Sequence, residues 1–414
     1  MNDFKLRPHQ EKAVQAAKPI LERSGVVLLA MECRTGKTFS ALELARMGAK
    51  GGRILFVTKK AAISSVVSDA EVMGLEVTVI NYEAAHKVDF KPDFVVIDEC
   101  HRVSAFPKMG KAAKVLREIC PRALGVVLLS ATPAIEAGSQ WFHAFHVTGR
   151  GPFAGYASFY KWHKDFGIPA KIRIAGGQEV NDYSSVRPEV ASAVTRYTVS
   201  MTQEEADFKV KAEVVPHLIE CPQLLSLGNS IHRDGIIKLD NRTVVAESPA
   251  AILQKAAMAC GSTLIDEDGE AFQVREGMFP KLNYIDARVW DGRSHAIFTQ
   301  YIMERELLLD HFGDYATDDM EAFRRGEFRL FVGSIKSYCE GVDLSWLDGS
   351  MILYSLTFSG STYAQILERM NNFKRTEPIK IHVLMIRGSV EESIFKAVSN
   401  KQNFNNSFLK RCRA

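Results

Sequence analysis

Residues 31–38 read MECRTGKT and lie between an apolar run, VVLLAM at 26–31, and a helix-like stretch, FSALELARMGAK, at 39–50. This pattern predicts a buried strand, a tight loop and a helix that begins within the motif. Backbone N–H groups at a helix N-terminus carry partial positive charge and bind phosphate. Lys37 could then reach the β- and γ-phosphates of a nucleotide, and Thr38 could ligate Mg²⁺. We therefore predict nucleotide contacts from Arg34, Thr35, Gly36, Lys37 and Thr38.

The loop by itself is a modest signal. The full phosphate-loop pattern begins with glycine, whereas this chain has Met31 at that position. A bare GKT also fits an ordinary strand, turn and helix with no ligand. The motifs that follow along the chain therefore decide how the loop is interpreted.

Size and composition are those of a globular protein with two domains, or three. The chain has 414 residues, of which 46% are hydrophobic and 24% are charged. A net charge of +3 means that any basic binding face must be local. The seven cysteines form no CxxC pair, which favours reduced thiols over a disulfide framework or a zinc ribbon.

Targeting signals are missing from the sequence given. The first ten residues, MNDFKLRPHQ, contain no apolar signal region, and no apolar run reaches membrane-spanning length. We therefore expect a cytoplasmic protein with no membrane partner.

Two groups of short apolar runs indicate two α/β domains. The first group comprises 26–31, 54–58, 76–80, 94–98 and 125–130, and the second comprises 295–301, 328–334, 350–356 and 380–386. β-branched runs that alternate with helical stretches, such as 111–119, are typical of parallel strands in doubly wound sheets. Thr202 with Glu205, and Ser389 with Glu392, have the spacing of helix-capping boxes.

A pair of acids follows one of these strands. FVVIDECH delivers Asp98 and Glu99 to the carboxyl end of a strand, where α/β sheets place their ligand chemistry. Asp98 could hold Mg²⁺, and Glu99 could orient or deprotonate an attacking water. Two acids at a solvated strand end are common, but the GKT loop upstream favours the functional interpretation. LLSATP at 128–133 follows, and the hydroxyls of Ser130 and Thr132 could link the acidic turn to other parts.

GKT, DECH and SATP, in this order and spacing, resemble motifs I, II and III of superfamily 2 helicases and translocases. LRPHQ resembles the family's Q-motif, which implies that Gln10 reads adenine. VGSIKSYCEGVDL at 332–344 resembles motif V, with Gly341 and Asp343 at the expected places. The resemblance covers nearly the whole chain and implies two tandem RecA-like domains, at 1–215 and 216–414. The stretch at about 150–200 is rich in glycine and aromatic residues and lacks periodicity, which indicates an irregular insertion or subdomain on the first domain. The second lobe resembles that of Swi/Snf motors. In its compact size the chain resembles phage-encoded enzymes of this superfamily. A phage-encoded enzyme would act in the cytoplasm of the bacterial host.

Motif VI departs from the family pattern. In YAQILERMNNFKR, Gln365 and Arg369 match, but Asn372 stands where the second arginine is usual. That arginine usually contacts the γ-phosphate, so Arg369 would carry the role, or Arg375 would replace it if the helix continues past Asn372. A weakened or inactive ATPase is the alternative.

The resemblance also implies where a nucleic acid lies. Eight residues match positions that grip a phosphate backbone without reading bases: Lys59, Lys60, Asn81, Tyr82, Thr299, Gln300, Ser334 and Lys336. The aromatic and basic residues of 156–173 could stack on bases or wedge a duplex, but such aromatics more often form a small core.

We therefore expect an ATP- and Mg²⁺-dependent DNA helicase or translocase with a monomeric motor core. One rival hypothesis is the same class of motor acting on RNA. The DECH motif and the Swi/Snf-like segment near the end of the chain, GSVEESIFKAVSNK, argue against it. The other is a non-catalytic binding module with a degenerate nucleotide pocket, which Asn372 supports and which Lys37, Asp98 and Glu99 oppose.

Overall fold

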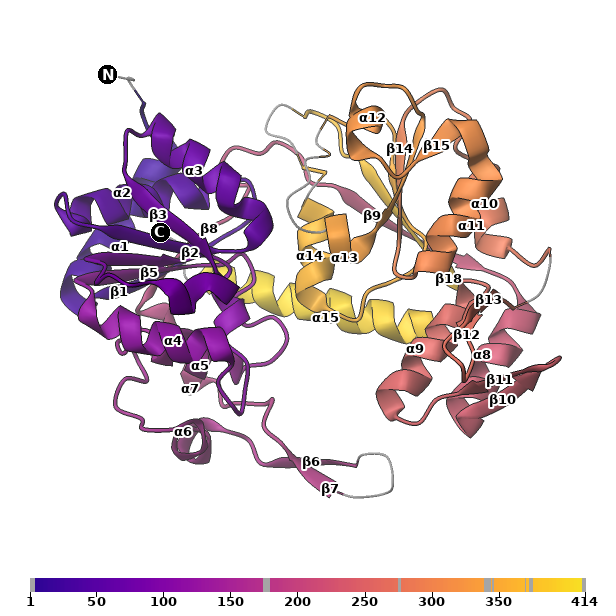
Figure 1. Cartoon of the computed structure of the whole chain (residues 1–414), viewed down its shortest axis with the longest axis horizontal. Coiled ribbons are helices and arrows are strands. Elements are labelled where there is room, and N and C mark those ends of the chain that lie inside the picture. Colours follow the sequence, from indigo (N-terminus) through magenta and orange to yellow (C-terminus); the bar gives the residue numbers. More distant parts are fainter. Residues whose placement is uncertain are drawn as a thin grey trace. The chain divides into compact units, whose positions relative to one another are not determined.

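The computed structural model describes residues 4–173, 179–274, 277–338, 344, 346–368, 370–371 and 375–411. The chain divides into two compact units. The first contains Met1–Ile172, Asn181–Asp207 and Lys401–Ala414, and the second contains Arg173–Val180 and Phe208–Asn400. The C-terminal helix α15 (Val390–Arg411) thus begins in the second unit and ends in the first (Figure 1).

The first unit is built on a six-stranded parallel sheet. Its strands are β1 (Val26–Met31), β2 (Ile54–Thr58), β3 (Val77–Asn81), β4 (Phe94–Ile97), β5 (Gly125–Leu129) and β8 (Thr198–Met201). Their order across the sheet is β3-β2-β4-β5-β1-β8. All five predicted strands are present, and each bound differs from the prediction by at most one residue. β8 was not predicted, because a single short apolar run in a segment without periodicity gives little signal.

Alternate residues of each strand enter two separate cores, one on each face of the sheet. Along β1, Val26 and Leu28 pack in one core, whereas Val27 and Leu29 pack in the other. The first core is covered by α4 (Lys111–Ile119), α5 (Gln140–His146), α6 (Phe159–Phe166) and α7 (Glu189–Thr195). The second is covered by α1 (Pro8–Ser24), α2 (Lys37–Ala49) and α3 (Ile63–Val72), and Figure 1 shows these two groups on opposite sides of the sheet. Strands buried on both faces explain the continuous apolar runs in the sequence.

The aromatic segment at 150–200 is mostly core. Phe159 and Trp162, on α6, are buried against Phe142 of α5, with ring centroids 5.8 and 5.2 Å from it. Only Tyr160 of this aromatic group is largely exposed, at 50%. The hairpin of β6 (Ala170–Arg173) and β7 (Glu179–Asp182) follows α6. The structure therefore favours the small-core interpretation of these aromatics.

The second unit repeats the architecture with another six-stranded parallel sheet. Its strands are β9 (Glu213–Ile219), β14 (His295–Thr299), β15 (Ala316–Thr317), β16 (Leu330–Ser334), β17 (Met351–Leu353) and β18 (Lys380–Ile386), in the order β15-β16-β14-β17-β18-β9. The predicted fold class, two tandem doubly wound α/β domains, is confirmed. The expected boundary between residues 215 and 216 falls inside β9, which pairs with β18 along its full length.

Helices again cover both faces of the second sheet. They are α10 (Pro280–Asp286) and α11 (Ile302–Phe312) on one face, and α12 (Met320–Arg324), α13 (Ile335–Tyr338), α14 (Gly360–Glu368) and α15 on the other. A subdomain that was not predicted separates β9 from β14. It comprises α8 (Pro222–Asp234), α9 (Pro249–Cys260) and the hairpins β10–β11 (Ile236–Leu239, Arg242–Val245) and β12–β13 (Thr263–Ile265, Ala271–Gln273).

The two predicted capping boxes differ in outcome. Ser389 precedes α15 and its hydroxyl accepts the N–H of Glu391, as expected of a helix start. Thr202 and Glu205 also exchange hydrogen bonds, of 2.9 and 3.2 Å, but the residues that follow form a turn and no helix.

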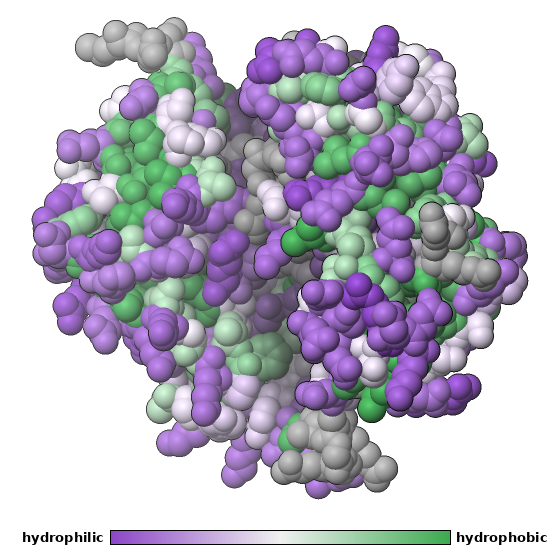
Figure 2. All heavy atoms as spheres, turned by 45° about the vertical axis from the view of Figure 1, so that its right-hand side comes forward, coloured by the Kyte–Doolittle hydropathy of each residue, from purple (hydrophilic) through white to green (hydrophobic). Residues whose placement is uncertain are grey.

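The surface is mainly polar. Figure 2 shows hydrophilic side chains over most of the face in view, with smaller hydrophobic patches between them. Among the described residues, we find no helix with the length and apolar character needed to cross a bilayer.

Candidate nucleotide-binding and hydrolysis site

The predicted strand, loop and helix are present at the phosphate loop. β1 ends at Met31 and α2 begins at Lys37. Between them, Arg34 and Gly36 have positive φ angles of 67° and 83°, which turn the backbone sharply. The first turn of any helix has N–H groups without intrahelical partners, so the start of α2 suits an anion.

Lys37 lies folded over this loop. Its Nζ donates to the backbone oxygen of Met31 at 2.9 Å and to that of Glu32 at 3.3 Å. These two bonds hold the ammonium group over the loop, where it could contact a phosphate bound at the N-terminus of α2. Thr38 is the next residue of α2 and is half-buried.

Contacts from α1 and from the residues after β8 fix the loop's shape. His9 bonds the oxygen of Thr35 at 3.0 Å. Gln203 donates from its backbone N–H to Glu32 Oε2 at 2.7 Å and from its side chain to the oxygen of Cys33 at 3.0 Å. His9, Glu32 and Gln203 were missed from the sequence; only His9, beside Gln10 in LRPHQ, offered any signal.

Two residues predicted to contact the nucleotide, Thr35 and Gln10, instead form hydrogen bonds to backbone groups of the protein. Thr35 is fully buried, and its hydroxyl donates to the oxygen of Glu32 at 2.7 Å. Gln10 is 5% exposed and accepts the N–H of Arg7 at 2.8 Å. A methyl group at Gly36 would lie 1.8 Å from Gln10 Nε2. We therefore assign the Thr35 side chain to shaping the loop, while adenine contact by Gln10 stays a prediction.

Asp98 lies at the same sheet edge, after β4, and its carboxylate is held on both oxygens. Thr58, at the end of β2, donates to Oδ2 at 2.7 Å, and the N–H of Glu99 donates to Oδ1 at 3.0 Å. Burial and the neighbouring Glu99 charge raise the pKa of Asp98 to about 6, while Lys37 acts to lower it. A buried carboxylate beside a second acid is the kind of oxygen ligand that suits Mg²⁺.

Glu99 adopts the left-handed conformation, with φ of 50°. Its Oε2 lies 3.3 Å from Nδ1 of His101. That oxygen is buried, and no group of the described residues meets it with hydrogen-bond geometry. An orphaned carboxylate oxygen in the turn that follows β4 is suited to accept a hydrogen bond from a water.

The acidic turn is linked to the SATP segment, as expected. Nδ1 of His101 lies 3.3 Å from Oγ of Ser130, which in turn accepts the N–H of Thr132 at 3.0 Å. The Thr132 hydroxyl itself has no hydrogen-bond partner among the described residues. His101 therefore connects the acidic turn to the end of β5.

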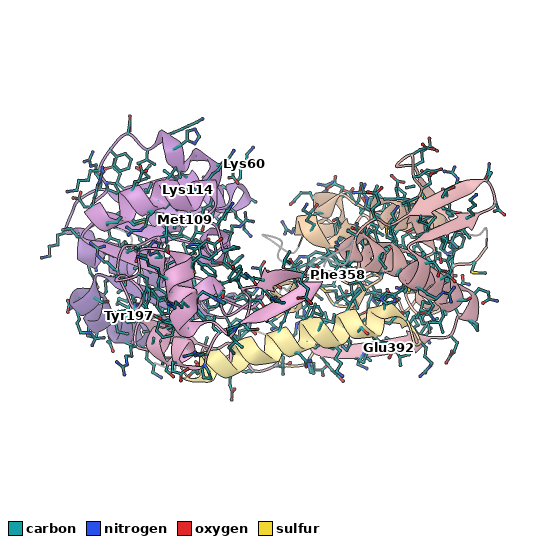
Figure 3. The ribbon with its side chains drawn as sticks, turned by 90° about the horizontal axis from the view of Figure 1, so that it is seen from below. Lys60, Met109, Lys114, Tyr197, Phe358 and Glu392 are labelled. Carbon is teal, nitrogen blue, oxygen red and sulfur yellow. The ribbon has the colours of Figure 1, made fainter. Side chains whose placement is uncertain are left out.

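Two predicted nucleic-acid contacts of the first unit, Asn81 and Tyr82, have side chains that are bonded within the fold. Tyr82 is only 5% exposed, and its hydroxyl donates to the backbone oxygens of Asp98 and Glu99. Asn81 is half-buried and caps the short 3₁₀ helix Tyr82–Lys87, its Oδ1 accepting the N–H of Ala84 at 2.8 Å. Lys59 is half-buried and Lys60 is exposed, with its side chain at the surface of the first unit in Figure 3.

The predicted nucleic-acid contacts of the second unit lie at or after the carboxyl ends of two neighbouring strands. Thr299 and Ser334 end the neighbouring strands β14 and β16. Thr299 is 1% exposed and is therefore not a surface contact, whereas Ser334 is half-buried and Lys336 is exposed. The backbone N–H of Gln300 donates to Oγ of Ser355 at 2.7 Å.

Motif VI is only partly described. Gln365, on α14, is buried at 3% exposure. Arg369 of motif VI lies outside the described residues, as do Gly341 and Asp343 of motif V.

Arg375 is not where the substitution hypothesis needs it. α14 ends at Glu368, and Arg375 donates to the oxygen of Leu347 at 2.8 Å. It lines a cavity of about 490 Å³ at the amino ends of β14 and β18, the edge opposite Thr299 and Ser334. The helical continuation that would have made Arg375 a neighbour of Asn372 is absent from the described residues.

No protein-family model matches the chain, and no curated protein sequence matches it. Among solved structures, the Sulfolobus solfataricus SWI2/SNF2 ATPase core in complex with double-stranded DNA is similar to this chain, with 13% sequence identity and a TM-score of 0.44. The alignment covers 98% of this chain and 92% of that one.

Proposed function

We propose that the protein is an ATP-dependent DNA translocase or helicase of superfamily 2. The observation that carries the proposal is the convergence of Lys37, Asp98 and Glu99 at one edge of the first sheet, with Thr58 and His101 supporting the two acids. A phosphate loop and a paired-acid turn at one sheet edge are the parts needed for phosphoryl transfer to water.

Each residue has a distinct role in the proposed reaction. The α2 N-terminus and Lys37 bind the phosphates of ATP and stabilise the charge that develops on the transferring phosphoryl group. Thr38 and Asp98 would hold Mg²⁺, which neutralises phosphate charge when bound. Glu99, with its orphaned Oε2, orients the attacking water and accepts its proton. Nδ1 of His101 lies 3.3 Å from that same oxygen, Oε2.

The nucleic-acid contacts are proposed at exposed or partly exposed residues after the strands. Lys59 and Lys60 follow β2, and Ser334 and Lys336 follow β16. Lysines and hydroxyls suit phosphate oxygens, so binding would depend on salt and little on base sequence. DNA is favoured over RNA by the DECH motif and by the Swi/Snf-like character of the last segment, GSVEESIFKAVSNK.

Steady-state ATPase assays with different nucleic acids test the proposal. We expect turnover to rise when single-stranded, duplex or forked DNA is added, and to rise less with RNA. Equal or greater stimulation by RNA would support the RNA motor instead. No turnover with any nucleic acid would support the degenerate binding module. Comparing duplex with forked DNA in a strand-displacement assay separates translocation from unwinding.

A further inference from the structure

Tyr82 occupies an unusual position relative to the acidic turn. It is the first residue of the 3₁₀ helix that follows β3, and β2 separates β3 from β4 in the sheet. Its hydroxyl nevertheless reaches past the end of β2 and donates to the backbone oxygen of Asp98, with the oxygen of Glu99 3.4 Å away. A single side chain that follows β3, a strand not adjacent to β4, thus contacts the backbone of both acidic residues.

The backbone at this turn needs such support. Glu99 has φ of 50°, a region that non-glycine residues enter only at a cost. The conformation persists only when the surroundings hold it. The side-chain oxygens of Asp98 are bonded to Thr58 and to the N–H of Glu99, and the backbone oxygen of Glu99 accepts the N–H of Arg102 at 2.9 Å. The backbone oxygen of Asp98 is held by Tyr82.

The Tyr82 side chain is fixed by its burial in the core. The side chain is 5% exposed, and its ring packs in the core on this face of the sheet. Burial, and the charge of Asp98, raise the pKa of Tyr82 well above its ordinary value.

We propose that Tyr82 is a positioning residue for ATP hydrolysis, which fixes the backbone of the Asp98–Glu99 turn so that both carboxylates face the phosphate loop. The inference rests on the proposed ATPase function. Without the hydroxyl, Glu99 can relax from its left-handed conformation, and its carboxylate then leaves the position from which it acts on water. Tyr82 itself touches no reacting atom.

Tyr82→Phe isolates the hydroxyl, because the ring that fills the core is retained. Tyr354→Phe is the matched control, since Tyr354 is also a buried tyrosine and its hydroxyl donates to a backbone oxygen, that of Gly261, at 3.3 Å in the second unit. Both variants are compared with the wild type at a temperature at which circular dichroism shows all three proteins to be folded.

We expect Tyr82→Phe to lower kcat by about 10- to 100-fold, because a shift of about 1 Å in a catalytic group has an effect of this size. KM for ATP should stay within about twofold, since the phosphate loop is untouched. Tyr354→Phe should leave both constants within about twofold. An unchanged kcat in folded Tyr82→Phe, or an equal loss in both variants, would overturn the proposal.

Hydrogen exchange gives a readout that does not depend on activity. In Tyr82→Phe we expect amides of residues 98–104 to exchange about tenfold faster than in the wild type, while β1 and β5 are unaffected. Unchanged exchange in this segment would overturn the proposal. If the wild type hydrolyses no ATP, the proposed function fails, and the exchange experiment still decides whether Tyr82 holds the turn.

Discussion

Glu99 is the single residue on which the proposed hydrolysis depends most. Its Oε2 is buried beside His101 and has no hydrogen-bond partner among the described residues. Thr58, Tyr82 and the N–H of Glu99 itself hold Asp98 and the turn, so the Glu99 side chain is not needed to shape the pocket.

Glu99→Gln should therefore retain ATP binding and lose turnover by about 100-fold or more, because an amide cannot accept the proton of the attacking water. Nucleotide affinity, measured by equilibrium titration, and single-turnover rates separate the two effects. If affinity falls together with the rate, Glu99 shapes the pocket and is not the base.

A second buried acid predicts how stability depends on pH. Glu304, at the start of α11, is fully buried, and its Oε2 accepts the Ser355 hydroxyl at 2.6 Å. Burial raises the pKa of Glu304 from 4.5 to about 7. The folded protein then holds a proton that the unfolded chain has released, so the free energy of unfolding should fall as pH rises from about 4.5 to about 7.

The slope from this one group is at most about 1.4 kcal/mol for each pH unit. Glu304→Gln should flatten the dependence by that amount, as measured by urea unfolding at several pH values. Glu391, whose pKa burial also raises, should still contribute a slope of the same sign in the variant. Identical slopes in the wild type and the variant would show that Glu304 is ionised in the folded protein.

Among the elements, the phosphate loop and α1 form one structural unit. Gln10 of α1 fills the space beside Gly36, and His9 bonds the oxygen of Thr35. Gly36→Ala introduces two unfavourable effects. An alanine would have to adopt a φ of +83°, and its Cβ would lie 1.8 Å from Gln10 Nε2. We expect it to reduce ATP affinity at least about tenfold and to destabilise the first unit by more than the roughly 1–2 kcal/mol cost of the backbone conformation alone.

Gly51→Ala is the matched control, because Gly51 has φ of +85° and, among the described residues, no atom lies within 4 Å of the place that its Cβ would take. It should show the conformational cost without the clash and leave ATP affinity unchanged. The difference between the two variants in thermal unfolding measures how tightly Gln10 packs on the loop. Equal destabilisation would mean that Gln10 moves aside freely.

Elements with a local signal were predictable, and those that depend on distant partners were not. α2 begins at Lys37 because the GKT pattern sets the turn, and β18 has the predicted bounds because KIHVLMI is one apolar run. β9 was missed, since its place is set by pairing with β18 across about 160 residues of intervening chain. The role of Tyr82 was also missed, because its hydroxyl bonds residues that only the sheet order brings near.

For the molecule as a whole, the two units supply different parts of the proposed motor. The family resemblance assigns the γ-phosphate contact to Arg369 of the second unit, and Arg375 lies at the other edge of that unit's sheet. Arg369→Ala should lower turnover about 1,000-fold or more, as expected of an arginine finger, with a smaller effect on ATP affinity. Arg375→Ala should change turnover little. A large loss from Arg375→Ala alone would reverse this assignment.

ATP turnover by the wild type and by Lys37→Ala, each with and without duplex DNA, tests the central claim most directly. The account predicts that the wild type hydrolyses ATP faster when DNA is present. It also predicts that Lys37→Ala, folded and still able to bind DNA, loses hydrolysis under both conditions, because the ammonium stabilises charge on the transferring phosphoryl group. Turnover in folded Lys37→Ala equal to that of the wild type would contradict the account.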